Sequence, residues 1–507
     1  MKVLVANRGE IACRILKTLR EMGVSSVAVH TAVDGGALHL DFADEVVPLG
    51  GGSPGDAGDA TGYLDGAALI AAARTHGADA IHPGYGFLSQ SASFAEACAQ
   101  AGIAFIGPSP QAMRLLADKR ASRRAAEEIG LPVIPGANVA DSVDEAAAAA
   151  EKVGFPILLK AAGGGGGKGM RKVERRADLD EAFAAARREA EAAFADGRLL
   201  VERFIAPARH VEVQVLGDGR DAVALGERDC SLQRRYQKII EEAPAPGLPE
   251  GTRRALLEDA ARLARHCGYA SAGTVEFLVG PDGAHYFLEV NTRLQVEHPV
   301  TEMLLGVDIV AAQIGLAQGG ALPRPAEPRG HAIEARLNAE DAHRGFLPSS
   351  GRVLVADWPN RPGVRVDTGI RAWSDVRPEY DPLLAKVIAW GADREQARRR
   401  LVEGLRDTTI LGVATNLSFL LQVLESAPFR SGATHTTLIE STRWPEPEIP
   451  DEALAAARRA LQSPAGRGTE GDGGEAPAVA SDASAAASDA DRFSPWRSDG
   501  DASRFRP

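Results

Sequence analysis

The chain contains 507 residues, of which 45% are hydrophobic and 25% charged, a composition typical of a soluble globular protein with two to four domains. Its net charge of −12 argues against a nucleic-acid or anionic-membrane partner held through bulk electrostatics. No apolar run approaches membrane-spanning length, and no signal or transit segment precedes the first strand, so we expect a cytoplasmic protein.

The cysteines are scattered and form no CxxC pair, which predicts free thiols of a reducing compartment and excludes a disulfide framework or a zinc site. They are Cys13, Cys98, Cys230 and Cys267.

The N-terminal segment alternates strand and helix patterns. An apolar strand over Lys2–Ala6 is followed by helical spacing over Ile11–Met22 and a second strand over Ser26–His30. The pattern continues with helices near Gly66–His76 and Ser91–Ala101 and with strands at 78–81 and 103–106. This order predicts a doubly wound α/β domain. The first turn holds Gly9 but no GxGxxG, so an NAD site is disfavoured.

The loop His82–Leu88 follows a predicted strand at its carboxyl end, where such folds bind ligands. A plain glycine-proline turn explains the same residues equally well. The sequence leaves both interpretations open.

A glycine run interrupts the middle of the chain. After a predicted helix over Leu115–Gly130, a strand over Ile157–Ala161 carries Lys160 into Gly163–Lys168. The run is not a Walker A loop, because Gly169 stands where Ser or Thr belongs and a strand, not a helix, follows over Met170–Glu174. We expect a glycine-rich mobile lid over phosphates. A flexible linker is the alternative, although linkers usually contain serine as well.

Charged residues recur in the next segments. A helix over Leu179–Ala195 and a strand over Leu199–Phe204 precede the alternating strand His210–Val215. Arg234 and Arg235 fit a solvated basic patch, whereas strand alternation from Tyr236 predicts that Lys238 shares its face.

A predicted hairpin gathers acidic side chains. Glu289 and Asn291 lie two apart on a strand and therefore share a face. A turn at 281–283 should fold the preceding strand back so that Glu276 lies opposite Glu289. Two carboxylates and an amide oxygen form a hard oxygen site suited to Mg²⁺. Arg293, Gln295, Glu297 and His298 follow at once, beside that site; a solvated hairpin edge is the alternative.

Five motifs follow one another over roughly residues 1–443, namely ANRGEIACRI, IHPGYGFLS, KAAGGGGGKGM, ERDCSLQRRYQKIIEEAPAP and FLEVNTRLQVEHPVTE. Together they resemble the biotin carboxylases, the ATP-grasp enzymes or domains of biotin-dependent carboxylases. It implies an α/β (α+β overall) fold with a Rossmann-like domain over 1–114, an ATP-grasp domain over 115–325 with its lid at about 131–204, and a β-rich C-terminal domain over 326–447.

The resemblance also implies an activity, in which MgATP and bicarbonate form carboxyphosphate and the carboxyl group passes to N1′ of carrier-bound biotin. Mn²⁺ could replace Mg²⁺. The implied ATP contacts are Lys119, Lys160, Gly166, Gly167, Glu202, Arg203, Phe204, Ile205, His210 and Tyr236. Glu276, Glu289 and Asn291 match the magnesium ligands.

The same resemblance assigns the reacting groups. Lys238, Arg293, Gln295 and the backbone N–H of Val296 match the bicarbonate site, and Glu297 matches the general base. Arg336, on a predicted strand over His331–Asn338, matches the arginine that stabilises the biotin enolate. The chain departs from the family at Gln90, where an acid is usual, and at Tyr236, where many members carry histidine.

The C-terminal segment resembles that of the family as far as predicted helices over 394–405 and 417–424. An alanine-rich helix over 451–462 and a disordered tail are expected beyond it, because residues 463–491 contain hardly any large apolar side chain. Apart from Met1 and Lys2 at the start of the first strand, no methionine precedes a lysine, so biotin should be attached to a separate carrier protein. A carboxyltransferase subunit and a homodimer are the other implied partners. The alternatives are an ATP-grasp ligase that joins a carboxylate to an amine, and a non-catalytic subunit.

Overall fold

The computed structural model describes residues 1–50, 59–162, 170–194, 196–324 and 326–446. Residues Met1–Trp444 form one compact unit, and the elements below belong to it. The predicted helix over 451–462, the predicted tail and the glycine run at 163–169 lie outside the described residues.

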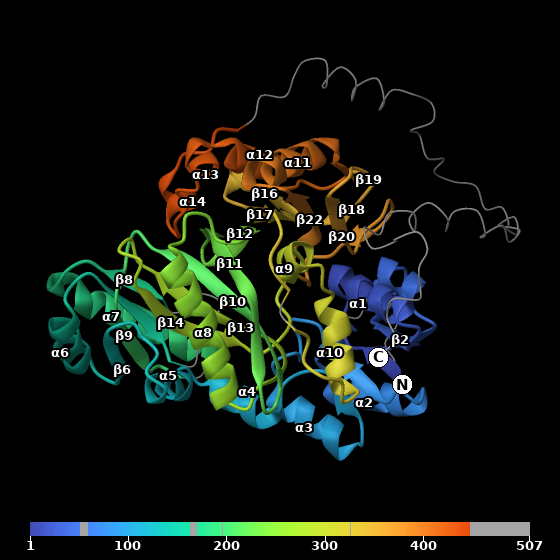
Figure 1. Ribbon diagram of the computed structural model, residues 1–507, viewed down its shortest axis with the longest axis horizontal. Helices are drawn as coiled ribbons and strands as arrows, with labels where there is room; N and C mark the ends of the chain where they lie inside the picture. The colour runs from blue at the N-terminus through green and yellow to red at the C-terminus, as the bar shows by residue number, and fades with distance from the viewer. Residues whose placement is uncertain (51–58, 163–169, 195, 325, 447–507) are drawn as a thin grey trace, which may run out of the picture. The chain divides into compact units, whose positions relative to one another are not determined.

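A five-stranded parallel sheet in the order β3-β2-β1-β4-β5 forms the N-terminal part (Figure 1). Its strands are β1 (Lys2–Val5), β2 (Ser25–His30), β3 (Glu45–Pro48), β4 (Ala80–His82) and β5 (Ala104–Phe105), and its helices are α1 (Gly9–Glu21), α2 (Gly66–Thr75) and α3 (Ala92–Gln100). Val3 and Val5 pack against α1, whereas Leu4 between them packs against α2 and α3. Alternate residues therefore bury both faces, which confirms the doubly wound prediction.

A four-stranded antiparallel sheet in the order β6-β9-β7-β8 forms a smaller layer, covered by two helices (Figure 1). The strands are β6 (Gly136–Ala140), β9 (Leu199–Arg203), β7 (Ile157–Ala161) and β8 (Arg171–Val173), and the helices are α6 (Val143–Val153) and α7 (Leu179–Phe194). The prediction of a strand on each side of the glycine run is confirmed. The core beneath the helices consists largely of alanine, valine and leucine.

An eight-stranded antiparallel sheet forms the centre, in the order β14-β13-β10-β11-β12-β15-β22-β20. Its strands in that order are His285–Asn291, Ala270–Val279, Arg209–Asp218, Ala222–Arg234, Gln237–Ala243, His331–Asn338, Leu383–Gly391 and Val364–Thr368. Glu276 pairs with Glu289 in register, as predicted for the hairpin. Because β12 pairs with β15, one sheet joins strands that are about 90 residues apart in the chain.

Helices cover both halves of this sheet. The core of the first half contains side chains of α8 (Glu250–His266), α4 (Pro110–Ala117) and α5 (Lys119–Glu128), and that of the second half contains side chains of α11 (Arg394–Asp407) and α12 (Leu417–Glu425). The remaining helices are α9 (His298–Leu305), α10 (Ile309–Ala317), α13 (Ala427–Ser431) and α14 (Leu438–Ser441). The remaining strands are β16 (Glu340–Asp341), β17 (Leu347–Pro348), β18 (Gly351–Arg352), β19 (Val355–Asp357), β21 (Asp375–Val376) and β23 (Thr409–Leu411).

Two local predictions were wrong. The single helix over Leu115–Gly130 is two helices, because Asp118 has extended backbone angles and its carboxylate accepts hydrogen bonds from the first N–H groups of α5. The prediction that strand alternation begins at Tyr236 also fails, since β12 starts at Gln237. Tyr236 has a φ of +66° and belongs to the turn before the strand.

Within the described part of the chain, no helix taken singly has the length and apolar composition needed to cross a membrane. The neighbouring helices α9 and α10 have that length and apolar composition only when they are taken together, and a bend of 95° separates them.

Candidate active site

A cavity of about 550 Å³ lies among the small sheet, the first strands of the central sheet and the loop that carries Tyr85. It brings together most of the residues predicted from the sequence, namely Lys119, Lys160, Glu202, His210, Tyr236, Lys238, Glu276, Glu289, Asn291, Arg293, Gln295, Val296, Glu297 and Arg336. Arg203 ends β9, Phe204 and Ile205 follow it, and none of the three lines the cavity. Gly166 and Gly167 lie outside the described residues.

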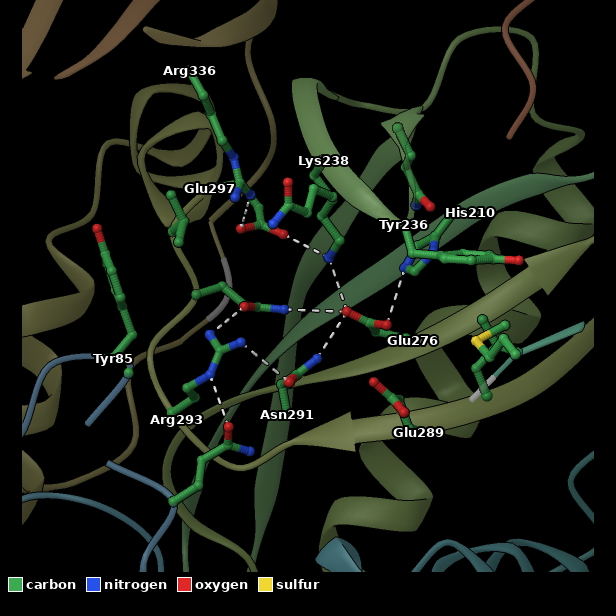
Figure 2. Close-up of a pocket in the computed structure, with 18 of the residues that line it drawn as sticks. Tyr85, His210, Tyr236, Lys238, Glu276, Glu289, Asn291, Arg293, Glu297 and Arg336 are labelled. Carbon is green, nitrogen blue, oxygen red and sulfur yellow. Dashed lines mark hydrogen bonds and ion pairs between the residues drawn. The ribbon is translucent and has the colours of Figure 1, made fainter. Parts of the chain in front are cut away.

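Lys238 lies at the centre of the cavity (Figure 2). Its Nζ donates to Glu276 Oε1 at 2.8 Å, to Glu297 Oε1 at 2.7 Å and to the Glu212 carboxylate. Burial alone would lower the pKa of Lys238, but the three carboxylates outweigh it and raise that pKa well above its usual value. The ammonium group is therefore a permanent positive charge at this position.

Glu297 is fully buried between two cations. Its Oε1 accepts from Lys238, and its Oε2 accepts from Arg336 Nη2 at 2.8 Å. Arg336 also forms an ion pair of 2.6 Å, through Nε, with the buried Glu241. Burial would raise the pKa of Glu297, but Lys238 and Arg336 hold it well below its usual range. Glu297 is thus deprotonated at any physiological pH.

A second set of contacts surrounds Glu276 (Figure 2). Its Oε1 accepts from Asn291 Nδ2 at 2.8 Å and from Gln295 Nε2 at 3.3 Å, and its Oε2 lies 3.2 Å from His210 Nε2. Arg293 donates to Gln295 Oε1 at 2.5 Å and to Asn291 Oδ1 at 3.3 Å. Side chains of β10, β12 and β14 and of the loop after β14 thus converge on one carboxylate of β13.

Asn291 turns its amide nitrogen toward Glu276 and its oxygen toward Arg293. To offer an oxygen to a cation beside Glu276, that amide would have to rotate. Among the described residues, the groups of three His, Cys, Asp or Glu ligand atoms within 4.8 Å of one another are His210–Glu212–Glu276 and Glu212–Cys230–Glu297. Glu289 belongs to neither and forms an ion pair with Lys119 at 3.5 Å.

The side of the cavity toward the small sheet carries its own charges. Lys160 on β7 lies 2.5 Å from Glu202 on the neighbouring strand β9. Lys119 is the first residue of α5, and about half of the Tyr236 side chain is exposed at the rim. Two lysines on one side of a cavity are suited to binding a polyphosphate, whose oxygens could replace their carboxylate partners.

Sequence reasoning missed a buried pair behind Lys238. Arg228 is fully buried and donates to Glu212 Oε1 at 2.7 Å, while the other Glu212 oxygen accepts from Lys238. The alternation over His210–Val215 puts Glu212 on the face of His210 and was a signal that could have found it. Gln90, a departure noted above, accepts a hydrogen bond of 3.1 Å from Arg293 Nε and so belongs to the same cluster.

Three family models match successive parts of the chain. They are biotin carboxylase, N-terminal domain, over residues 1–113; carbamoyl-phosphate synthase L chain, ATP binding domain, over 118–324; and biotin carboxylase C-terminal domain, over 334–441. A biotin carboxylase from Nostoc is 44% identical over 87% of this chain and 98% of its own length. The rice methylcrotonoyl-CoA carboxylase subunit alpha is 47% identical over 87% of this chain. The match covers 60% of the length of that relative.

Solved structures agree with these matches. The biotin carboxylase from Campylobacter jejuni, in a β,γ-ATP complex, has a TM-score of 0.84 and 42% identity, over 87% of this chain and 98% of that one. The biotin carboxylase domain dimer of Hydrogenobacter thermophilus 2-oxoglutarate carboxylase was solved with MgADP, ADP and bicarbonate. It has a TM-score of 0.84 and 40% identity, over 88% of this chain and 99% of that one. The chain therefore belongs to the biotin carboxylase family and is an ATP-dependent carboxylase.

Proposed function

We propose that this protein catalyses the first half-reaction of an acetyl-CoA or other acyl-CoA carboxylase. In that reaction ATP and bicarbonate form carboxyphosphate, and the carboxyl group passes to biotin on a separate carrier protein. The observation that carries the proposal is the buried Glu297, held between Lys238 and Arg336 in a cavity large enough for a nucleotide.

ATP would lie between the small sheet and the central sheet. Lys119, Lys160 and His210 would neutralise its phosphates, with Gly166 and Gly167 in the covering loop. Glu202, Arg203, Phe204 and Ile205 would contact adenine and ribose, and Tyr236 could hydrogen-bond a ribose or phosphate oxygen. The Lys160–Glu202 contact supports this arrangement, since an incoming phosphate could replace the carboxylate as partner of the lysine.

The oxygen ligands in the cavity fit Mg²⁺. Glu276 and Glu289 are paired on adjacent strands and Asn291 lies two residues beyond Glu289 on the same face, a set typical of magnesium sites completed by phosphate oxygens. Glu276, Glu289 and Asn291 would hold Mg²⁺, which would stabilise the negative charge that develops in phosphoryl transfer.

Bicarbonate would lie beside Lys238 and Arg293. Gln295 and the backbone N–H of Val296 would complete the donor set for a small planar anion. Glu297 would remove the bicarbonate proton, so that the bicarbonate oxygen attacks the γ-phosphorus and ADP leaves. The low pKa of Glu297 keeps it in the anionic form that a base requires.

Arg336 would act in the second step. Carboxyphosphate would break down to CO₂ and phosphate, and the phosphate would take the N1′ proton of biotin. Removal of that proton leaves negative charge on the ureido oxygen, and the guanidinium would stabilise this oxyanion while N1′ attacks CO₂. Its ion pairs with Glu241 and Glu297 hold the group at the cavity wall, which supports the assignment.

The proposed partners are a biotin carboxyl carrier protein, a carboxyltransferase subunit and a second copy of this chain. The near-complete match to the Nostoc biotin carboxylase supports a carrier on another polypeptide. The proposed compartment is the cytoplasm, supported by free cysteines at positions 13, 98, 230 and 267.

Bicarbonate-stimulated, biotin-dependent ATP hydrolysis tests the proposal. An ATP-grasp ligase of the acyl-phosphate type would hydrolyse ATP with another carboxylate and amine, and a non-catalytic subunit would show no turnover. The intact Lys238–Glu297–Arg336 arrangement favours the biotin carboxylase.

A further inference from the structure

Lys386 is a fully buried cation to which none of the steps above gives a role. It lies in the middle of β22 and pairs directly with Arg336 on β15. Directly paired residues on adjacent antiparallel strands share a face, and like charges in that position destabilise a sheet. The cost is offset on the other side of the strand, where Asp367 on β20 pairs with Lys386. Burying a second cation beside Arg336 costs free energy, so its presence indicates a functional role.

The contacts of Lys386 Nζ indicate what that role is. The ammonium group donates a hydrogen bond of 3.0 Å to the main-chain oxygen of Val296. It also lies 3.1 Å from Glu10 Oε2 and 3.8 Å from Asp367 Oδ2. Lys386 therefore contacts the backbone immediately before Glu297.

The peptide that Lys386 holds needs an external support. Residues 292–297 lie between the end of β14 and the start of α9 and belong to neither element. The Val296 carbonyl belongs to the peptide that joins Val296 to Glu297, so its orientation determines where the Glu297 N–H points and where the Glu297 side chain starts. A hydrogen bond from a rigid, buried strand residue fixes that orientation.

Glu10 extends the support to a second loop. It is buried in the first turn of α1, and its carboxylate accepts a hydrogen bond from the hydroxyl of Tyr85, which lines the cavity. Lys386 and Glu10 together connect the first helix, the loop of Tyr85 and the loop of Glu297. The sequence motifs around Glu10 and Tyr85 thereby gain a physical role.

We propose that Lys386, held by Glu10, is a positioning residue that fixes the Val296–Glu297 peptide in the geometry that binds bicarbonate. Lys386 itself does not line the cavity and acts only through that peptide. The inference rests on the proposed function, because it assumes that bicarbonate binds at Val296 and Glu297. A looser peptide should weaken the use of bicarbonate and leave ATP binding unchanged.

The test is steady-state ATP hydrolysis by Lys386→Met, with ATP and bicarbonate varied separately and free biotin or the carrier present. We expect the KM for bicarbonate to rise about tenfold or more and the KM for ATP to stay within about twofold. The matched control is Arg398→Met, which removes another buried cation, on α11, that donates to Glu395 and does not line the cavity. Both KM values of this control should stay within about twofold of the wild type.

Lys386→Met leaves Glu10 buried without its cation, so a second variant guards against poor folding. In the double variant Lys386→Met/Glu10→Gln both charges are removed, while Asp367 keeps its hydrogen bonds to Arg365. The same rise in the KM for bicarbonate is expected. Unchanged KM values for bicarbonate in a folded variant, or equal rises for bicarbonate and ATP, would overturn the inference. Wild-type protein that hydrolyses no ATP in response to bicarbonate would instead refute the proposed function.

Discussion

Replacing Glu297 by glutamine removes one charge from the cavity and preserves the volume of the side chain. Glutamine cannot accept the bicarbonate proton, and loss of a general base typically lowers turnover by about 10²–10⁴-fold. We therefore expect bicarbonate-dependent ATP hydrolysis by Glu297→Gln to fall at least about 100-fold, while the KM for ATP stays within about twofold.

The structure also sets the expected stability of this variant. Breaking an isolated buried ion pair costs about 3–5 kcal/mol. Here Lys238 keeps Glu212 and Glu276 as partners, and Arg336 keeps Glu241. No cation is left unpaired, so we expect a loss of only about 1–3 kcal/mol in the free energy of unfolding.

The matched control is Glu302→Gln. Glu302 is also buried between two cations, with Arg14 at 2.8 Å and Arg365 at 2.7 Å, but it does not line the cavity. It should lose comparable stability in urea titrations, with turnover per folded molecule within about threefold of the wild type. If Glu297→Gln kept more than about a tenth of wild-type turnover, the assignment of Glu297 as the base would be refuted.

Three further outcomes are expected. Arg336→Met should lower the turnover of biotin-dependent ATP hydrolysis by about 10²–10³-fold without a change in the KM for ATP, because the biotin oxyanion loses its cation; wild-type turnover would exclude that role. EDTA should abolish ATP hydrolysis, and Mg²⁺ or Mn²⁺ should restore it, whereas activity that survives EDTA would argue against the metal site. Burial raises the pKa of Glu241 from 4.5 to about 7, so the folded protein binds a proton that the unfolded chain releases, and its stability should fall as pH rises through that window. Glu241→Gln should remove up to about 3 kcal/mol of this fall in urea titrations between pH 4.5 and 8, and an unchanged pH slope would contradict the raised pKa.

Local patterns predicted the parts of the site that lie close together in the chain. The alternation before Asn291 and the turn at 281–283 were sufficient to pair Glu276 with Glu289. The strands on either side of the glycine run followed from their apolar residues in the same way. In these cases a few neighbouring residues determine the geometry.

Contacts between distant strands could not be predicted in this way. Lys386 lies opposite Arg336 only because β22 pairs with β15, and Glu241 reaches Arg336 only because β12 pairs with β15. Strand order is a property of the whole fold and leaves no local pattern in the sequence. The helix break at Asp118 was missed for a different reason, since apolar spacing continues across a residue whose side chain caps the next helix.

The transfer of label from [¹⁴C]bicarbonate to biotin tests the central claim most directly. With ATP, Mg²⁺ and biotin, free or on its carrier, the wild-type protein should form carboxybiotin, and Glu297→Gln should form at least about 100-fold less. ATP hydrolysis by the wild-type protein without any label in biotin would contradict the proposed reaction.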